Sequence, residues 1–308
     1  MRARPALAIA LTATSLVACV HAGASPSTTA RMRVTAKVGV GFGSCGIAYA
    51  FGKLWTATNG DNRLVRIDLR TRKVLKRVMR RGPCGVAAGA GSIWVDGYGS
   101  SVVERVNPRT VRVTRRFRTE PAPWDVAFFD GAVWTTHSGL LMRIDPASGR
   151  TVRRFELAGD LSNMDVGFDS LWVGANDGTV AYRVHPDGRV DALQVDAQGP
   201  SSFAVGRDAV WVTARPGDVV RRIDPATNEL GPSIAVGSNP TMGAEAADGS
   251  IVVPITGDGT LVRIDPARNA VVETIRVGPR PIKVVRVGGA LWVTHLGGNA
   301  VWRVNLVP

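Results

Sequence analysis

An all-β fold is predicted by three features of the sequence, and more specifically a seven-bladed β-propeller of four-stranded antiparallel blades. Glycine and proline are frequent, with 35 and 18 among 308 residues, which favours turns and short strands over long helices. A tryptophan recurs at spacings of 38 to 41 residues, with valine in one place: Trp55, Trp94, Trp134, Trp172, Trp211, Val252 and Trp292. A turn residue and an aliphatic residue precede each key position. A period near 40 residues is typical of propeller blades rather than of helical solenoids.

The second half of each repeat carries a turn signal. An Asp, Asn or His lies thirteen residues after the key position, or eleven in the third repeat: Asp68, Asn107, Asp145, His185, Asp224, Asp265 and Asn305. In five repeats a proline follows, which is type I turn chemistry. Short Val-, Ile- and Thr-rich segments lie between these marks. Each repeat therefore predicts four strands, named a to d from the inside of the ring outward.

The two ends of the repeat region predict how the ring closes. The last repeat stops near Asn305, where its strand d should begin, whereas Val34 to Gly41 aligns with the strand at Val271 to Gly278. We expect the N-terminal strand to complete the last blade, because this removes the open edge of a linear stack. The propeller is predicted to span residues 33–308.

The first 32 residues predict export and a lipid anchor. Arg2 and Arg4 precede an apolar run from Ala6 to Ala18, which is too short to span a bilayer and ends directly before Cys19. This order resembles the bacterial lipobox, so we expect residues 1–18 to be a lipoprotein signal peptide and Cys19 to be lipidated. The alternative is an ordinary secretory signal. Residues 19–32 are predicted to be a flexible tether to the extracytoplasmic face of a bacterial membrane.

The repeat segments resemble a known group of proteins. Gly85-Val86-Ala87, Gly91-Ser92-Ile93-Trp94-Val95 and Val262-Arg263-Ile264-Asp265-Pro266-Ala267 are similar to the repeats of bacterial YVTN-type and virginiamycin B lyase-like propellers, relatives of the NHL-repeat proteins. This resemblance implies the propeller fold for the whole mature domain. For a lyase it would also imply a His at the start of strand a, a Glu after the aromatic residue of strand b, and a divalent metal.

Candidate ligand-binding residues lie at the predicted mouth of the channel, where the d–a and b–c connections meet. A large aromatic surface, hydrogen-bonding groups and opposite charges gather there: Trp124, Asp125, His137, Ser162, Asn163, Ser201, Ser202, Lys283 and His295. Such a mixture suits a small polar or aromatic ligand, and the alternative is packing of the loop ends without a ligand. His137 and His295 belong to the third and seventh repeats, too far apart to share a proton or a metal. We therefore predict no catalytic residues, no metal and no cofactor.

Two cysteines at equivalent positions predict a disulfide. Cys45 and Cys84 both lie ten residues before the key tryptophan, in neighbouring repeats, at a strand spacing that overlaps the Cα separation of a disulfide. Export supplies an oxidising compartment, and lipidation of Cys19 leaves an even pair. The alternative is a pair of free thiols that line the mouth.

The formal net charge of +13 is unevenly distributed. Residues 63–118 contain fifteen Arg or Lys against three acids. The predicted outer strands carry many of them: Lys76, Arg77, Arg80, Arg81, Arg112, Arg115, Arg116 and Arg118. They predict contact with anionic lipid or cell-wall polymer, or simply protection against edge-to-edge aggregation. Nucleic acid is not an expected partner of an exported protein.

These observations favour a monomeric, lipid-anchored scaffold that binds a ligand or a protein at the cell envelope. The alternative is a lyase- or hydrolase-type enzyme with its site at the channel mouth. A likeness of fold alone does not decide between them, because propellers host both kinds of function.

Overall fold

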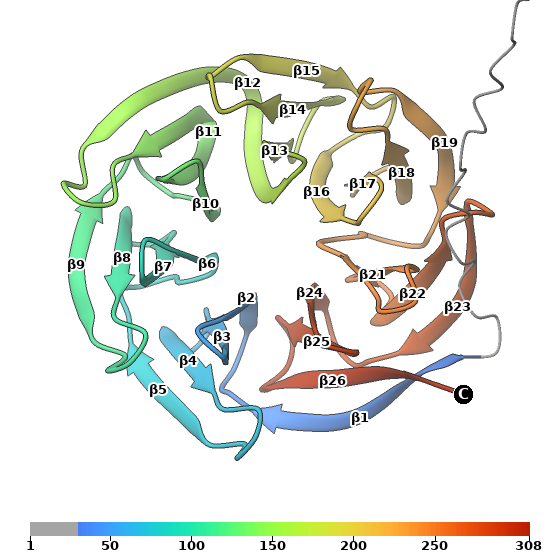
Figure 1. Ribbon diagram of the computed structural model, residues 1–308, viewed down its shortest axis with the longest axis horizontal. Coiled ribbons are helices and arrows are strands. Elements are labelled where there is room, and N and C mark those ends of the chain that lie inside the picture. The colour runs from blue at the N-terminus through green and yellow to red at the C-terminus, as the bar shows by residue number, and fades with distance from the viewer. Residues whose placement is uncertain (1–29) are drawn as a thin grey trace, which may run out of the picture.

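The computed structural model describes residues 30–308, which form a ring of antiparallel sheets around a central channel (Figure 1). The first sheet contains β2 (Ser44–Ala50), β3 (Lys53–Thr58), β4 (Arg63–Ile67) and β5 (Val74–Val78). The second contains β6 (Val86–Gly89), β7 (Ser92–Gly97), β8 (Val102–Val106) and β9 (Val113–Arg118). Strand order follows the chain from the channel outward, as the repeat pattern predicts.

A six-stranded sheet follows, with β10 (Val126–Phe129), β11 (Ala132–Ile144), β12 (Thr151–Gly167), β13 (Ser170–Ala175), β14 (Val180–Val184) and β15 (Val190–Gln194). The fourth sheet contains β16 (Pro200–Val205), β17 (Val210–Ala214), β18 (Val219–Ile223) and β19 (Leu230–Ala235). The fifth contains β20 (Ala244–Glu245), β21 (Ile251–Ile255), β22 (Thr260–Asp265) and β23 (Ala270–Arg276). No helix among residues 30–308 is long and apolar enough to cross a membrane.

The last sheet closes the ring with the N-terminal strand. Its order is β1 (Arg31–Gly39), β26 (Ala300–Val307), β25 (Ala290–His295) and β24 (Pro281–Val287). β1 pairs with β26 from Arg31 opposite Val307 to Gly39 opposite Ala300. The predicted closure is confirmed, and β1 covers the edge that β26 would otherwise expose (Figure 1).

The predicted number of seven blades is wrong: the strands form six sheets, and the third and fourth repeats share the six-stranded one. β12 joins them, because Thr151 to Asp160 pair with β11 and Leu161 to Gly167 pair with β13. Leu161 stands where four other repeats have a proline, so nothing interrupts the strand there. β11 is continuous because the third repeat is two residues shorter after its tryptophan.

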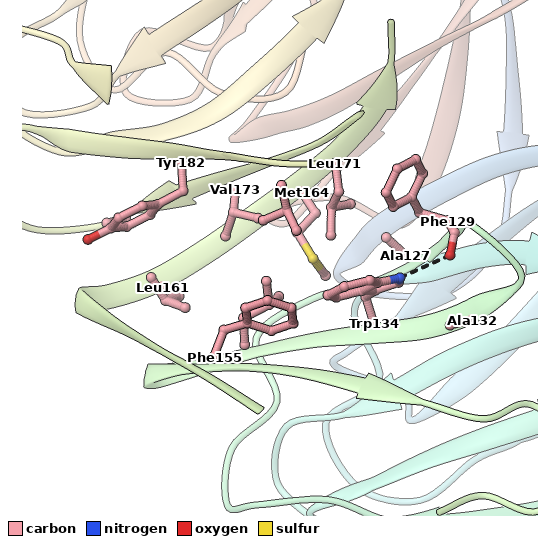
Figure 2. Close-up of a cluster of buried hydrophobic side chains, with 13 residues drawn as sticks. Ala127, Phe129, Ala132, Trp134, Phe155, Leu161, Met164, Leu171, Val173 and Tyr182 are labelled. Atoms are coloured by element: carbon pink, nitrogen blue, oxygen red, sulfur yellow. Dashed lines mark hydrogen bonds between the residues drawn. The ribbon is translucent and has the colours of Figure 1, made fainter. Parts of the chain in front are cut away.

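The key tryptophans are core residues. All six are at most 6% exposed. The indole N–H groups of Trp55, Trp94, Trp134 and Trp172 donate to the carbonyl five residues earlier at 3.0–3.1 Å, which fixes the turn between strands a and b. Figure 2 shows the bond from Trp134 to Phe129 within the apolar cluster of the six-stranded sheet. The repeat that has Val252 instead has no such donor.

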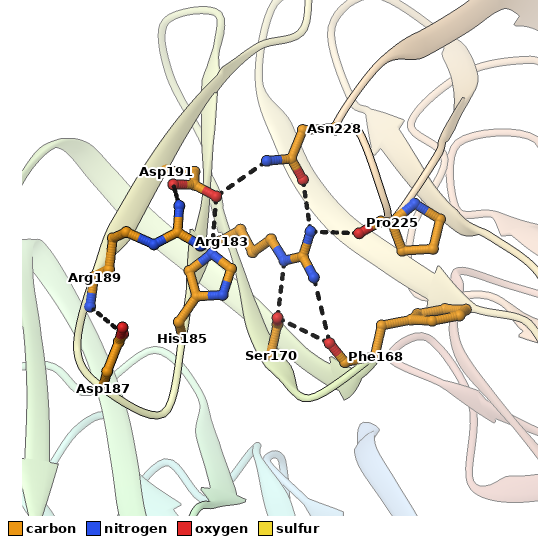
Figure 3. Close-up of polar contacts among 9 residues, drawn as sticks. All are labelled: Phe168, Ser170, Arg183, His185, Asp187, Arg189, Asp191, Pro225 and Asn228. Atoms are coloured by element: carbon orange, nitrogen blue, oxygen red, sulfur yellow. Dashed lines mark hydrogen bonds and ion pairs between the residues drawn. The ribbon is translucent and has the colours of Figure 1, made fainter.

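In several repeats, an arginine of strand c donates a hydrogen bond to the next repeat. Arg183 lies opposite Trp172, with its guanidinium 4.9 Å from the centroid of the ring. It donates to Ser170 Oγ at 2.8 Å and reaches the next repeat through the Pro225 carbonyl at 2.6 Å (Figure 3). Arg66 makes the corresponding bond to the Pro108 carbonyl at 3.1 Å. An arginine occupies this position in every repeat, so part of the positive charge serves the fold.

The disulfide between Cys45 and Cys84 is present, with a Cα–Cα separation of 5.1 Å. It joins the inner edges of the first two repeats. The prediction is confirmed, and the alternative of two free thiols at the mouth is excluded for this structure.

Candidate functional site

A cavity of about 620 Å³ lies in the channel, within the range of small-molecule sites. It is lined by residues of β2, β6, β12, β16, β20 and β24, mostly from the parts of strand a that lead into the a–b turns. Its apolar wall includes Ile47, Val86, Met164, Phe203, Met242 and Val284. Among the predicted ligand residues, Lys283 lines this cavity.

Most of the predicted polar residues are used to join neighbouring repeats. Ser162 Oγ donates to the Ser201 carbonyl at 2.8 Å. Asn163 Nδ2 donates to the same carbonyl at 3.1 Å and to Ser202 Oγ at 2.9 Å. These four side chains are brought together as predicted, but all are at most 6% exposed. The bonds from Ser162 and Asn163 hold the fourth and fifth repeats to each other, whereas Ser201 Oγ is buried without a hydrogen-bond partner among the described residues.

Trp124 and Asp125 have different environments. Trp124 is half-buried and packs edge to face against Tyr98, with ring centroids 5.8 Å apart, so it keeps some exposed aromatic surface. Asp125 is 4% exposed. Its Oδ1 accepts a hydrogen bond from the Val126 N–H at 2.8 Å, and its Oδ2 accepts one from the Met164 N–H at 2.9 Å. Asp125 therefore links two inner strands.

A second buried acid, Asp96, faces Asp125 across Gly85. Asp96 Oδ1 accepts hydrogen bonds from the Cys84 and Gly85 N–H groups, whereas its Oδ2 is buried without a hydrogen-bond partner among the described residues. A Cβ on Gly85 would lie 2.6 Å from Asp96 Oδ2 and 2.5 Å from Asp125 Oδ1, so the two carboxyl groups need a glycine there.

Burial raises the pKa of both carboxyl groups. For Asp96 the pKa lies well above its usual range, because burial disfavours the charged form and the Asp125 charge adds to that effect. For Asp125, burial raises the pKa and the Lys283 charge opposes the rise. Sequence reasoning missed Asp96, although it is the one acid among the positions two residues after the key residue.

The charged groups of the cavity come from four inner strands or their ends. Arg207 Nε and Glu245 Oε1 form an ion pair at 2.8 Å. Asp165 and Lys283 are half-buried and face the same cavity from β12 and β24. Burial raises the pKa of Asp165, and Lys283 opposes this rise.

The predicted histidines are buried and lie apart. His137 on β11 is 3% exposed, with Nε2 3.0 Å from Thr135 Oγ1 and Nδ1 3.0 Å from the Pro121 carbonyl. His295 on β25 is 1% exposed and stacks against Trp302, with ring centroids 4.9 Å apart. Burial lowers the pKa of both imidazoles. The ring nitrogens of His137 are hydrogen-bonded, whereas Nδ1 and Nε2 of His295 are buried without a hydrogen-bond partner among the described residues.

The residues do not fit the metal that a lyase resemblance implies. Within residues 30–308, no three His, Cys, Asp or Glu side chains gather in a way that could hold a metal ion. His185, the remaining described histidine, contacts Asp191 at 2.8 Å (Figure 3).

The predicted basic residues are all exposed and lie on or beside the outer strands β5 and β9, which follow one another around the rim (Figure 1). Some have partners: Arg116 pairs with the buried Glu104 at 2.7 Å, and Arg77 Nε donates to the Val111 carbonyl at 2.8 Å. The side chains of Lys76, Arg80, Arg112 and Arg118 have no hydrogen-bond or ion-pair partner in the described part of the chain and are available to an anionic surface.

Comparison with solved structures places the fold among known propellers. No protein-family model and no curated protein matches the sequence. A streptogramin B lyase structure aligns with a TM-score of 0.78 at 16% identity, covering 90% of this chain and 98% of that one. Virginiamycin B lyase from Staphylococcus aureus gives 0.79 at 17% identity, with 90% and 100% covered. The WD40 propeller domain of Doa1 gives 0.74 at 12% identity, with 89% and 97% covered. At these identities the likeness extends to the fold, so this chain has a β-propeller fold similar to that of virginiamycin B lyase.

Proposed function

We propose that the protein is an extracytoplasmic binding scaffold that holds a small ligand in the central cavity. The observation that carries this proposal is the cavity itself, which has a volume of about 620 Å³ and is lined by both apolar and charged side chains. A cavity of this size and lining suits a compact ligand with both apolar and charged parts.

A lyase- or hydrolase-type activity is the second candidate, because the virginiamycin B lyases share the fold. The residues favour binding. His137 and His295 are buried in separate sheets. Ser162 and Asn163 of the fourth repeat already donate hydrogen bonds to the fifth repeat, to the Ser201 carbonyl and to Ser202 Oγ. A general acid and base would need to reach one reacting group together.

The lipid anchor remains part of this proposal. Cys19 and the whole segment of residues 1–29 lie outside the described residues. A disulfide in the domain agrees with export, since disulfides persist in oxidising compartments. We expect Cys19→Ala to release the protein from the membrane fraction, and retention of the variant after a high-salt wash would argue against lipidation.

Native mass spectrometry of protein purified from its host tests the binding function. We expect the wild type to carry an additional mass that denaturation removes. Ala244→Trp, which fills the cavity from its wall, should lose this mass. Ala147→Trp on an exposed outer turn is the matched control and should keep it. A wild-type protein with only its own mass, and no ligand retained, would contradict the proposal.

A further inference from the structure

Two opposite charges face the cavity without an ion-pair partner. Asp165 lies on β12, and its Oδ1 accepts a hydrogen bond from the adjacent Val166 N–H at 2.9 Å. Lys283 lies on β24, and its ammonium forms no hydrogen bond or ion pair with any residue from 30 to 308. Figure 1 shows β12 and β24 on opposite sides of the channel. The cavity is thus polarised across its width, with a carboxylate on one wall and an ammonium on the other.

The other charged side chains that line the cavity are either paired with each other or exposed. Arg207 and Glu245 bond to each other, through Nε to Oε1 at 2.8 Å and through the Arg207 N–H to Oε2. Arg286, which is exposed, can be solvated. The Lys283 charge opposes the rise in pKa that burial causes in Asp165, Asp125 and Asp96. Lys283 forms no direct ion pair with these acids, so Asp165 and Lys283 are the half-buried charged groups of the cavity wall that are left without an ion-pair partner among residues 30–308.

Apolar side chains line the same cavity as the two charges, among them Met164, Phe203, Met242 and Val284. Charged groups in such surroundings lose hydration, and an oppositely charged hydrogen-bonding partner restores part of the lost free energy. A ligand with one charge would satisfy one wall only.

We propose that the cavity selects a small zwitterion with an apolar body, such as a short apolar peptide, whose ammonium contacts Asp165 and whose carboxylate contacts Lys283. This inference rests on the proposed binding function and specifies the class of ligand. Burial raises the pKa of Asp165, so an incoming ammonium would also favour its charged form.

Isothermal titration calorimetry with three probes tests the proposal. The probes are leucyl-phenylalanine, its N-acetyl derivative, which lacks the ammonium, and its C-terminal amide, which lacks the carboxylate. We expect wild-type protein at pH 7 to bind the free dipeptide at least tenfold more tightly than either blocked form. Equal affinities for the three probes, or no binding of any, would overturn the proposal.

Two variants assign the ends of the ligand. Asp165→Asn should remove the preference for the free amine while the preference for the free carboxylate persists. Lys283→Met should have the opposite effect. Asp169→Asn and Lys73→Met, both exposed, are the matched charge controls and should behave as the wild type. If the variants and the controls discriminate alike, the assignment of the two charges is wrong.

The two proposals can fail separately. If native mass spectrometry finds a ligand in the cavity but the zwitterionic probe does not bind, the binding function stands and the ligand class is wrong. If neither a retained ligand nor a bound probe is found, both are wrong.

Discussion

Removal of the disulfide between Cys45 and Cys84 should destabilise the domain by a predictable amount. The bond closes a loop with a sequence separation of 39 residues. In the chain-entropy model, a loop of this length contributes about 4 kcal/mol to the free energy of unfolding at 25 °C. The entropy of unfolding of a domain this long is about 0.6 kcal/mol/K, so the thermal midpoint should fall by about 7 °C.

Alanine is the appropriate replacement at both positions. The Gly46 N–H donates to the Cys84 carbonyl at 2.9 Å, and Thr294 Oγ1 donates to the Cys45 carbonyl at 2.6 Å. Both acceptors are backbone groups that Cys45→Ala and Cys84→Ala retain. The single variants and the double variant should lose similar free energy, because each removes the same bond.

Differential scanning calorimetry of the residue 30–308 domain, with and without a reducing agent, measures the effect. Reduction should lower the wild-type midpoint to that of the double variant and leave the double variant unchanged. Two reactive thiols in unfolded, unreduced wild type would refute the reasoning, as would a double variant that loses the sum of the two single losses.

Three further variants test other features of the ring. Asp96→Asn should change the pH dependence of the free energy of unfolding. The pKa of Asp96 is raised in the folded state, so its stabilising contribution is present at low pH and is lost as the pH rises through the folded-state pKa. Urea titrations should therefore show a smaller loss of stability above about pH 4 in the variant than in the wild type. Arg183→Met should lower the free energy of unfolding by about 2–3 kcal/mol, because it removes charged hydrogen bonds to the neighbouring repeat, whereas the exposed Arg189→Met should cost under about 1 kcal/mol by the same urea assay. Replacement of Lys76, Arg112 and Arg118 by Glu should weaken sedimentation with anionic vesicles at low salt, and equal wild-type binding to neutral and anionic vesicles would refute the anionic-surface proposal.

Features with a local sequence signal were predictable. The turn chemistry, the tryptophan period and the alignment of Val34 to Gly41 with a later strand d led to the antiparallel propeller and its closure through β1. The pairing of Cys45 with Cys84 followed from their equivalent positions in adjacent repeats. Each of these depends on residues that are near in sequence or that recur at whole multiples of the repeat period.

The number of sheets depended on finer details. The prediction of seven separate blades assumed that every repeat begins a new sheet. Leu161 in place of a proline allows β12 to continue from the third repeat into the fourth. The tryptophans remain about 40 residues apart whether or not β12 is continuous. Their spacing therefore does not reveal that two repeats share a sheet.

The site depended on contacts between repeats. The sequence suggests that Ser162, Asn163 and Ser202 are available to a ligand, yet each is buried and hydrogen-bonded to a partner one repeat away. Asp165 has no marked sequence signal, because its role depends on an apolar cavity and on Lys283 across the channel. Such juxtapositions arise only when the ring is assembled.

The location of the bound molecule can be measured in a crystal structure of protein purified from its host, without added ligand. We expect electron density in the cavity between β12 and β24, against Met164, Phe203 and Met242. A ligand bound instead at the d–a face beside Trp124, with this cavity filled only by water, would contradict the proposed site.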